Sequence, residues 1–147
     1  MSDLHGYYLE DLAIGMSASY AKTVTETDVI LFAGISGDDN PMHINEHFAR
    51  ETIFKGRIVH GMFSAALISC VAGTRLPGPG AIYLDQSLRF KAPVRIGDTV
   101  TARVTIKDIH YEKKRVLADT ICTVNGGVVV EGQASYRVNS RQAVKAA

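Results

Sequence analysis

Residues 61–74, which read GMFSAALISCVAGT, decide the fold of this chain. The run is uncharged, lies between His60 and Arg75, and carries apolar or small side chains on nearly every side. This pattern predicts a helix that other structure encloses. The run falls short of the roughly 20 residues that a membrane-spanning helix needs. It ends at Leu76-Pro77-Gly78-Pro79-Gly80, a segment whose prolines and glycines cannot continue a helix.

After this turn the hydrophobic pattern changes to a two-residue period. Apolar residues alternate with polar ones over residues 82–90 and again over residues 100–106, which predicts two strands. Further strands are predicted at Arg115–Val124 and Val128–Val138. Asn125-Gly126-Gly127 joins these last two, and its residues accept the positive φ of a tight hairpin. The second half of the chain is therefore predicted to be an antiparallel meander.

The first half is more helical. A strand is predicted at Ser17–Val24, a short amphipathic helix from Thr27-Asp28 to Ile35, and a second short helix at Asn45–Phe54. Because strands and helices do not alternate along the chain, we expect an α+β domain in which helix packs on an antiparallel sheet. Residues 1–147 should form one domain, with the last few residues as a flexible tail.

Composition narrows the class of protein. The chain has 147 residues and 15.9 kDa, with 46% hydrophobic and 21% charged residues, as a single globular domain requires. Its net charge of +1 and its lack of a basic block argue against a nucleic-acid partner. Cys70 and Cys122 lie in apolar surroundings without metal-site or redox spacing, so we expect buried thiols in a reducing compartment. No apolar signal region occurs at the N-terminus, so a cytoplasmic protein that does not bind membranes is expected.

The densest group of polar residues is Ser36–His43, which reads SGDDNPMH. Gly37 can end the preceding helix with a positive φ, and Pro41 restricts its neighbour, so the segment should be a stiff loop. Asp38 and His43 could converge on one water molecule as an acid–base pair. Ordinary turn and cap residues with a solvated histidine would also explain the same segment. Spacing alone leaves both interpretations open.

Residues 32–43, FAGISGDDNPMH, resemble the hydratase-2 motif of the MaoC-like (R)-specific enoyl-CoA hydratases, whose core is Gly-Asp-x-Asn-Pro-x-His. The resemblance continues at Ile58-Val59-His60-Gly61-Met62 and over residues 76–80, 82–83, 86–88 and 90–98. One departure is Met42, where the family usually has a branched aliphatic residue. A swap between apolar residues of similar volume should move little.

The resemblance implies a hot-dog fold, a homodimer or a higher assembly, and reversible hydration of trans-2-enoyl-CoA to (R)-3-hydroxyacyl-CoA without a metal or organic cofactor. By the alignment of the motif, Asp38 and His43 are the catalytic pair. The backbone N–H of Gly61 would bind the thioester carbonyl. Asn40 would brace the loop or the pair, and Ser69 would line the substrate site.

Several alternatives stay open at this stage. The same pair could serve an (R)-3-hydroxyacyl-ACP dehydratase, while a hot-dog acyl-CoA thioesterase or a non-catalytic acyl-CoA-binding domain would use a similar site differently. Ser69 could instead bond back to the carbonyl of Ala65. His60, at a helix start, is more typical of loop architecture than of catalysis. His43 and His47 have zinc-like spacing but no evident third ligand, so no metal site is expected.

Basic residues offer candidates for the CoA phosphates, or simply charged turns. They are Arg89, Lys91, Arg95 and the tripeptide Lys113-Lys114-Arg115.

Overall fold

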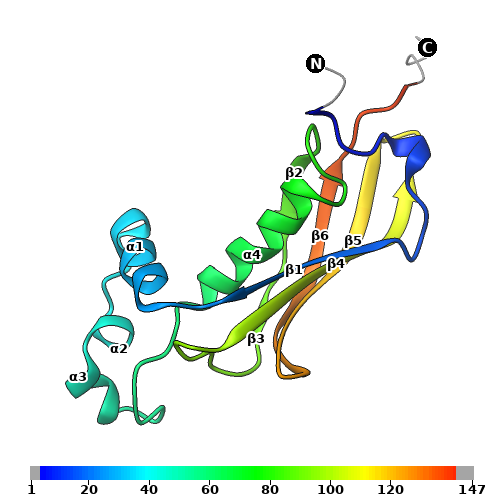
Figure 1. The fold of residues 1–147 in the computed structure, drawn as a ribbon. Helices are drawn as coiled ribbons and strands as arrows, with labels where there is room; N and C mark the ends of the chain where they lie inside the picture. Colours follow the sequence, from blue (N-terminus) through cyan, green and yellow to red (C-terminus); the bar gives the residue numbers. More distant parts are fainter. Residues whose placement is uncertain (1–3, 142–147) are drawn as a thin grey trace.

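A computed structural model describes residues 4–141, and its centre is one antiparallel sheet (Figure 1). The strands run in the order β1-β4-β5-β6-β2, and a further short strand, β3, also pairs with β6. Their bounds are β1 (Ser17–Thr23), β2 (Ile82–Gln86), β3 (Arg89–Phe90), β4 (Thr99–His110), β5 (Arg115–Val124) and β6 (Gly127–Arg137). A short 3-10 helix, η2 (Leu9–Asp11), precedes β1. The predicted antiparallel meander is confirmed for β4, β5 and β6, whereas the segment at residues 82–90 pairs with β6 instead of with the next strand β4.

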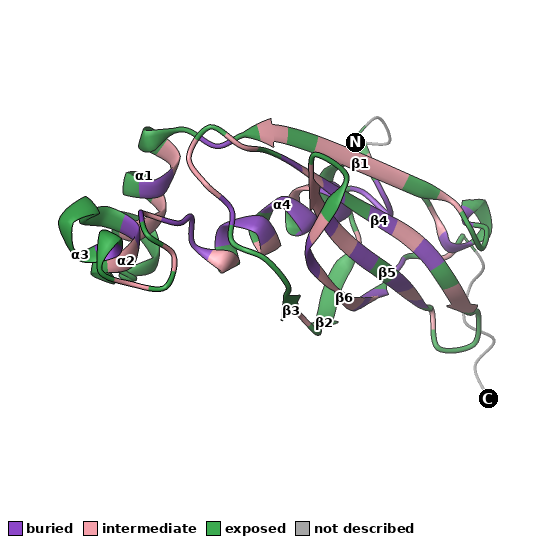
Figure 2. Ribbon diagram, turned by 90° about the horizontal axis from the view of Figure 1, so that it is seen from below, coloured by how far each residue is buried: buried purple, intermediate pink, exposed green. Residues whose placement is uncertain are grey.

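Helix α4 (Gly61–Thr74) packs along one face of this sheet, with the bounds that the sequence predicts. Ile68 and Val71 of α4 are fully buried in one hydrophobic cluster that also contains Val104 and Ala118 of the sheet. Buried and exposed positions alternate along β4 and β5, as expected of a sheet with one covered face (Figure 2). The α+β architecture, with helix packed on antiparallel sheet, is confirmed.

The turn between β5 and β6 has the conformation that its sequence predicts. Asn125 has φ 49° and Gly126 has φ 82°, so both lie in the left-handed region that a two-residue hairpin turn prefers. Asn and Gly tolerate this region better than other residues. The turn therefore sets the register of two long neighbouring strands.

The single strand predicted over residues 82–90 is wrong in two respects. It is divided into β2 and β3, and a bulge lies between Tyr83 and Asp85. Leu88 packs against the core, but the apolar residues of β2 do not join it, since Ile82 is 55% and Leu84 is 42% exposed. The period of two identifies a strand with one apolar face, but it does not reveal whether this chain or another molecule covers that face.

Three short helices form a separate group beyond the N-terminal end of α4 (Figures 1 and 2). They are α1 (Glu26–Ser36), α2 (Pro41–Ile44) and α3 (Glu46–Arg50). Helix α1 begins slightly before the predicted start, because Thr25 caps it and Asp28 completes a capping box.

The predicted helix Asn45–Phe54 is too long, and the predicted loop at residues 36–43 contains part of an unpredicted helix. Asn45 caps α3, and the backbone at Lys55 has φ 56°, which does not belong to a right-handed helix. Helix α2 is a single turn that starts at Pro41 with Asn40 as its cap. Capping side chains thus divide this segment into shorter pieces than its hydrophobic pattern suggests.

The two cysteines differ in burial. Cys122 is buried as predicted, whereas Cys70 is only half-buried. Across residues 4–141, no helix combines the length and apolar character that crossing a bilayer would require. The predicted flexible tail falls outside the described residues.

Candidate active site

A cavity of about 410 Å³ opens where the three-helix group meets the start of α4. Its wall is mainly apolar and includes Phe54, Ile58, Phe90 and Val130. Polar side chains from separate parts of the chain also reach it: Asp38, His43, His60, Ser64 and Lys91. An apolar cavity with a few convergent polar groups is the usual form of a small-molecule site.

Asp38 occupies the loop between α1 and α2. Gly37 ends α1 with φ 76°, and its N–H donates to the carbonyl of Ala33 at 2.9 Å. The Asp38 N–H donates to the Ser36 hydroxyl at 3.2 Å, and an Asp38 carboxylate oxygen accepts from the Asn40 N–H at 3.3 Å. These bonds hold the loop, and the carboxylate stays exposed at the cavity. The neighbouring Asp39 does not line it.

His43 lies on α2 and is 7% exposed. Its Nδ1 is 2.8 Å from the carbonyl oxygen of Ile58. A carbonyl only accepts hydrogen bonds, so Nδ1 carries a proton and the neutral ring keeps a lone pair on Nε2. His43 is therefore held rigidly, as expected, but by the single turn of α2 and the carbonyl of Ile58 rather than by a loop.

Arg57 also holds helix α2, which carries His43, in place. Its Nε donates to the carbonyl of His43 at 2.6 Å, and its two terminal nitrogens bond both carboxylate oxygens of Glu26 at 3.1 and 2.8 Å. The guanidinium therefore ties α1 to α2. Sequence reasoning did not select Arg57, because nothing in its local pattern shows that it bridges two helices.

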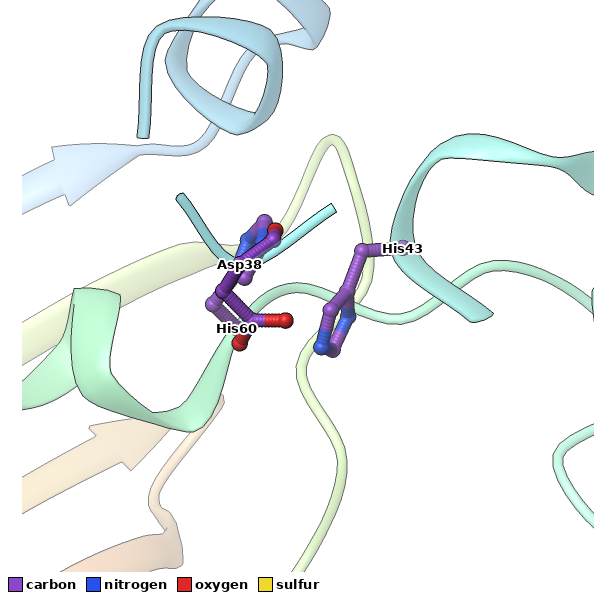
Figure 3. A group of neighbouring side chains, drawn as sticks. All are labelled: Asp38, His43 and His60. Carbon is purple, nitrogen blue, oxygen red and sulfur yellow. The ribbon is translucent and has the colours of Figure 1, made fainter. Parts of the chain in front are cut away.

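His60 is the N-cap residue of α4 and is only 1% exposed. Its Nε2 donates to the backbone carbonyl of Asp38 at 2.9 Å, and its ring centroid is 3.9 Å from that of His43. The architectural role expected of His60 is therefore present, but its side chain also joins the polar cluster (Figure 3). One ligand-capable atom each from Asp38, His43 and His60 lies within 4.8 Å of the others.

Gly61 begins α4 at the cavity wall. A Cβ at this position would come within 2.6 Å of the Phe90 ring, so a side chain would collide with the opposite wall. The first N–H groups of a helix have no partner within the helix and lie at the positive end of its dipole. Ser64, one turn later, is buried at the same cavity, and its hydroxyl has no hydrogen-bond partner within residues 4–141. Sequence reasoning missed Ser64; its place one turn after Gly61 was the available signal.

Two predicted substrate-site residues lie elsewhere. The Asn40 side chain accepts from the Met42 N–H at 3.1 Å and caps α2, so it braces the loop without lining the cavity. Ser69 is exposed on α4, is not part of the cavity wall, and makes no bond to the carbonyl of Ala65. The reason is helical periodicity, since the α4 face that carries Ser64 into the cavity turns Ser69 outward.

The structure also shows where the residues proposed as metal ligands or phosphate contacts lie. His47 is exposed and lies outside the Asp38/His43/His60 cluster, in which His60 is the member that sequence spacing did not reveal. Among the basic candidates, Lys91 alone lines the cavity. Arg95 instead donates to the carbonyl oxygens of Phe54 and Arg57.

Comparison with known proteins agrees with this geometry. The family model described as MaoC like domain matches residues 13–130. An (R)-specific enoyl-CoA hydratase of Rhodospirillum rubrum is 60% identical over 95% of this chain and 96% of its own length. A 3-hydroxybutyryl-CoA dehydratase of Methylorubrum extorquens is 44% identical over 97% and 90%.

An unliganded R-hydratase of Pseudomonas aeruginosa superposes with a TM-score of 0.85 at 41% identity, covering 91% of this chain and 86% of that one. The hot-dog fold implied by the resemblance is confirmed by this match. Two of these three relatives are hydratases by name, and the third is a dehydratase, the same reaction read in reverse. Family model, sequence and fold thus agree over most of the chain, which belongs to the MaoC-like domain family.

Proposed function

We propose that this protein is an (R)-specific enoyl-CoA hydratase, which adds water reversibly to a trans-2-enoyl-CoA to give the (R)-3-hydroxyacyl-CoA. The observation that carries the proposal is the convergence of Asp38 and His43 at one apolar cavity, beside the N-terminus of α4. The 60% identity to a named (R)-specific enoyl-CoA hydratase over nearly the full length of both chains supports it.

The chemistry follows from an acid and a base on one side of a flat substrate. One member of the Asp38/His43 pair takes a proton from water while its oxygen bonds to C3 of the enoyl group. The π electrons move toward the thioester carbonyl, and the pair then returns the proton taken from water to C2. The bond between Nδ1 of His43 and Ile58 fixes the ring, so the free Nε2 is held toward the cavity in one tautomer.

The developing negative charge on the thioester oxygen needs hydrogen-bond donors. The backbone N–H of Gly61 lies at the start of α4, where helix geometry and dipole both favour an anion. The absence of a side chain leaves the space that the carbonyl would enter, since a Cβ would fill it up to Phe90. Gly61 therefore provides both the donor and the access to it.

The reaction needs no metal ion and no organic cofactor, because every step is a proton transfer or an addition to an already activated double bond. One ligand-capable atom each from Asp38, His43 and His60 lies within 4.8 Å of the others. In the proposed reaction these atoms surround the attacking water rather than a metal ion.

Coenzyme A is the carrier that the relatives favour, since those at 60% and 44% identity are both named for CoA substrates. Lys91 is the basic residue placed to meet a carrier phosphate, because it lines the cavity and its ammonium group pairs with Glu131 at 3.3 Å on the surface. An ACP-linked substrate is the second candidate, because the chemistry at the pair would be identical.

A homodimer follows from the exposed edge of the sheet. Strand β2 is the last in the strand order, and it exposes Ile82 and Leu84 to solvent. An edge strand with exposed apolar side chains is a template for pairing with a second chain. We expect two copies to join here, in the cytoplasm, and multi-angle light scattering with Leu84→Glu tests the assembly.

The direct test is to incubate the purified protein with crotonyl-CoA and follow the ultraviolet absorbance of the enoyl thioester. Free thiol is measured in parallel, and the product is offered to an (R)-specific dehydrogenase. Absorbance should fall without thiol release, and the product should be the (R) isomer. Asp38→Asn and His43→Ala should each remove most of the turnover, whereas Asp39→Asn, whose side chain does not line the cavity, should be mild.

The alternatives give different results. Release of free thiol would identify a thioesterase, and binding without turnover would indicate a non-catalytic acyl-CoA-binding domain. Turnover only of the ACP-linked substrate would reassign the carrier. A dead Asp39→Asn variant beside an active Asp38→Asn variant would show that the catalytic carboxylate has been assigned to the wrong residue.

A further inference from the structure

His60 has one nitrogen that its architectural role does not use. The residue is 1% exposed, and its Nε2 donates to the carbonyl of Asp38. Its Nδ1 is buried without any hydrogen-bond partner among the described residues, and the residue lines the cavity. A buried polar atom without a partner normally costs roughly 1–3 kcal/mol, so its persistence at a cavity wall indicates that something else binds it.

The protonation of the ring decides what this atom can bind. A carbonyl oxygen can only accept, so the bond to Asp38 places the proton on Nε2. In the neutral ring, Nδ1 then carries a lone pair and can only accept. His43 is in the mirror situation, because its Nδ1–H donates to Ile58 and leaves a lone pair on Nε2. Together with the carboxylate of Asp38, the cavity wall therefore presents three hydrogen-bond acceptors.

The three groups lie close together. One ligand-capable atom of each residue lies within 4.8 Å of the other two, so the three side chains are near enough to surround one water molecule. Figure 3 shows that the three side chains come from the loop after α1, from α2 and from the start of α4. The ring of His60 also packs against Phe32 at 4.9 Å and against His43 at 3.9 Å, so it cannot swing freely.

We propose that His60 is a third catalytic residue, which accepts the second O–H of the attacking water at Nδ1 and so directs the oxygen lone pair at C3. This inference rests on the proposed hydration. Water has two hydrogens to donate: one is taken by a member of the Asp38/His43 pair, and the other stays on the oxygen, bonded to His60. The pair then returns the transferred proton to C2, so that water is added in full and the pair ends in its starting state. His60 itself neither gains nor loses a proton.

Two substitutions separate the two nitrogens of the ring. In His60→Gln the amide nitrogen can occupy the place of Nε2 and keep the bond to the Asp38 carbonyl, but nothing replaces Nδ1. In His60→Asn the amide oxygen can occupy the place of Nδ1, but the bond to Asp38 is lost. The first variant removes the proposed water contact, and the second removes the architectural contact.

The measurements are kcat for crotonyl-CoA hydration, the dissociation constant of butyryl-CoA, and the thermal midpoint Tm. Butyryl-CoA is saturated and cannot be hydrated, so it reports the site without the chemistry. We expect His60→Gln to keep Tm and butyryl-CoA affinity and to lose about 10- to 100-fold in kcat, the scale of a misplaced reactant. His60→Asn should have the lower Tm of the two and the higher kcat.

A His60→Gln protein with wild-type kcat would overturn the proposal. A His60→Gln protein whose Tm or butyryl-CoA affinity falls together with kcat would also overturn it. The same holds if His60→Asn is less active than His60→Gln. Either result would make the role of His60 purely structural. These failures differ from failure of the hydratase assignment itself, in which the unmodified protein would leave crotonyl-CoA unchanged.

Discussion

Substitution of Gly61 by alanine should separate catalysis from stability. The new Cβ would lie 2.6 and 2.7 Å from two atoms of the Phe90 ring, well inside normal contact. Phe90 is 55% exposed, so its ring can rotate away at a cost of about 1–3 kcal/mol. Replacing a helical glycine returns up to about 1 kcal/mol. The net destabilisation should therefore lie between about 0 and 3 kcal/mol.

The effect on turnover should be much larger. If the Gly61 N–H stabilises the thioester oxygen, a methyl group beside it displaces the carbonyl, and the loss of one such donor costs roughly 10²–10³ in kcat. The assay is the initial rate of crotonyl-CoA hydration, with urea unfolding to measure stability. Gly73→Ala, on the same helix, is the matched control, because its Cβ would meet no atom within 4 Å. It should keep full activity and gain slightly in stability.

The double variant Gly61→Ala/Phe90→Ala tests the reason for the loss. Removing the ring relieves the collision and should restore stability without restoring kcat. If kcat returned with the smaller side chain at residue 90, the displaced ring would have blocked the cavity, and the role assigned to the Gly61 N–H would be refuted. Single-variant activity within about threefold of the unmodified protein would refute it as well.

Three further predictions test the supports of the site and the thiols. Arg57→Met removes the bonds to the His43 carbonyl and to α1, and should lower both unfolding free energy, by about 1–2 kcal/mol, and kcat in the crotonyl-CoA assay. Asn40→Ala removes the α2 cap and should cost about 1 kcal/mol in urea unfolding with unchanged butyryl-CoA affinity. Burial raises the pKa of Cys122 to about 12, so thiolate is scarce below that pH, and a maleimide at pH 8 should label Cys70 in the folded protein and Cys122 only after unfolding.

The sequence predicts best where a long element has one clear pattern. Helix α4 and strand β5 have the bounds that residues 61–74 and 115–124 indicate, because an enclosed apolar run and a sustained period of two each admit few alternatives. Prediction fails over residues 36–54, where side-chain caps from Asn40 and Asn45 create two short helices. Helices this short depend on a few local hydrogen bonds, which leave little trace in hydrophobic periodicity.

The strand at residues 82–90 shows a second limit. The strand is divided where the backbone of β6 comes close to it. A Cβ on Gly132 of β6 would lie 1.8 Å from the carbonyl oxygen of Ser87, so only glycine fits at residue 132. The two residues are far apart in sequence, and neither pattern indicates the other. The bulge at Tyr83 and the exposed face of β2 follow from such tertiary contacts rather than from the local period of two.

The candidate site shows why a motif and a structure give different information. The motif brings Asp38 and His43 together, since both lie on one short segment. His60 belongs to another helix and joins them through its bond to the Asp38 carbonyl and its ring contact with His43. An architectural role for a histidine at a helix start does not exclude a catalytic one. The bond that makes His60 architectural also fixes its tautomer, and the tautomer leaves Nδ1 as a buried acceptor at the cavity. Support of the loop and orientation of water are therefore two consequences of a single hydrogen bond.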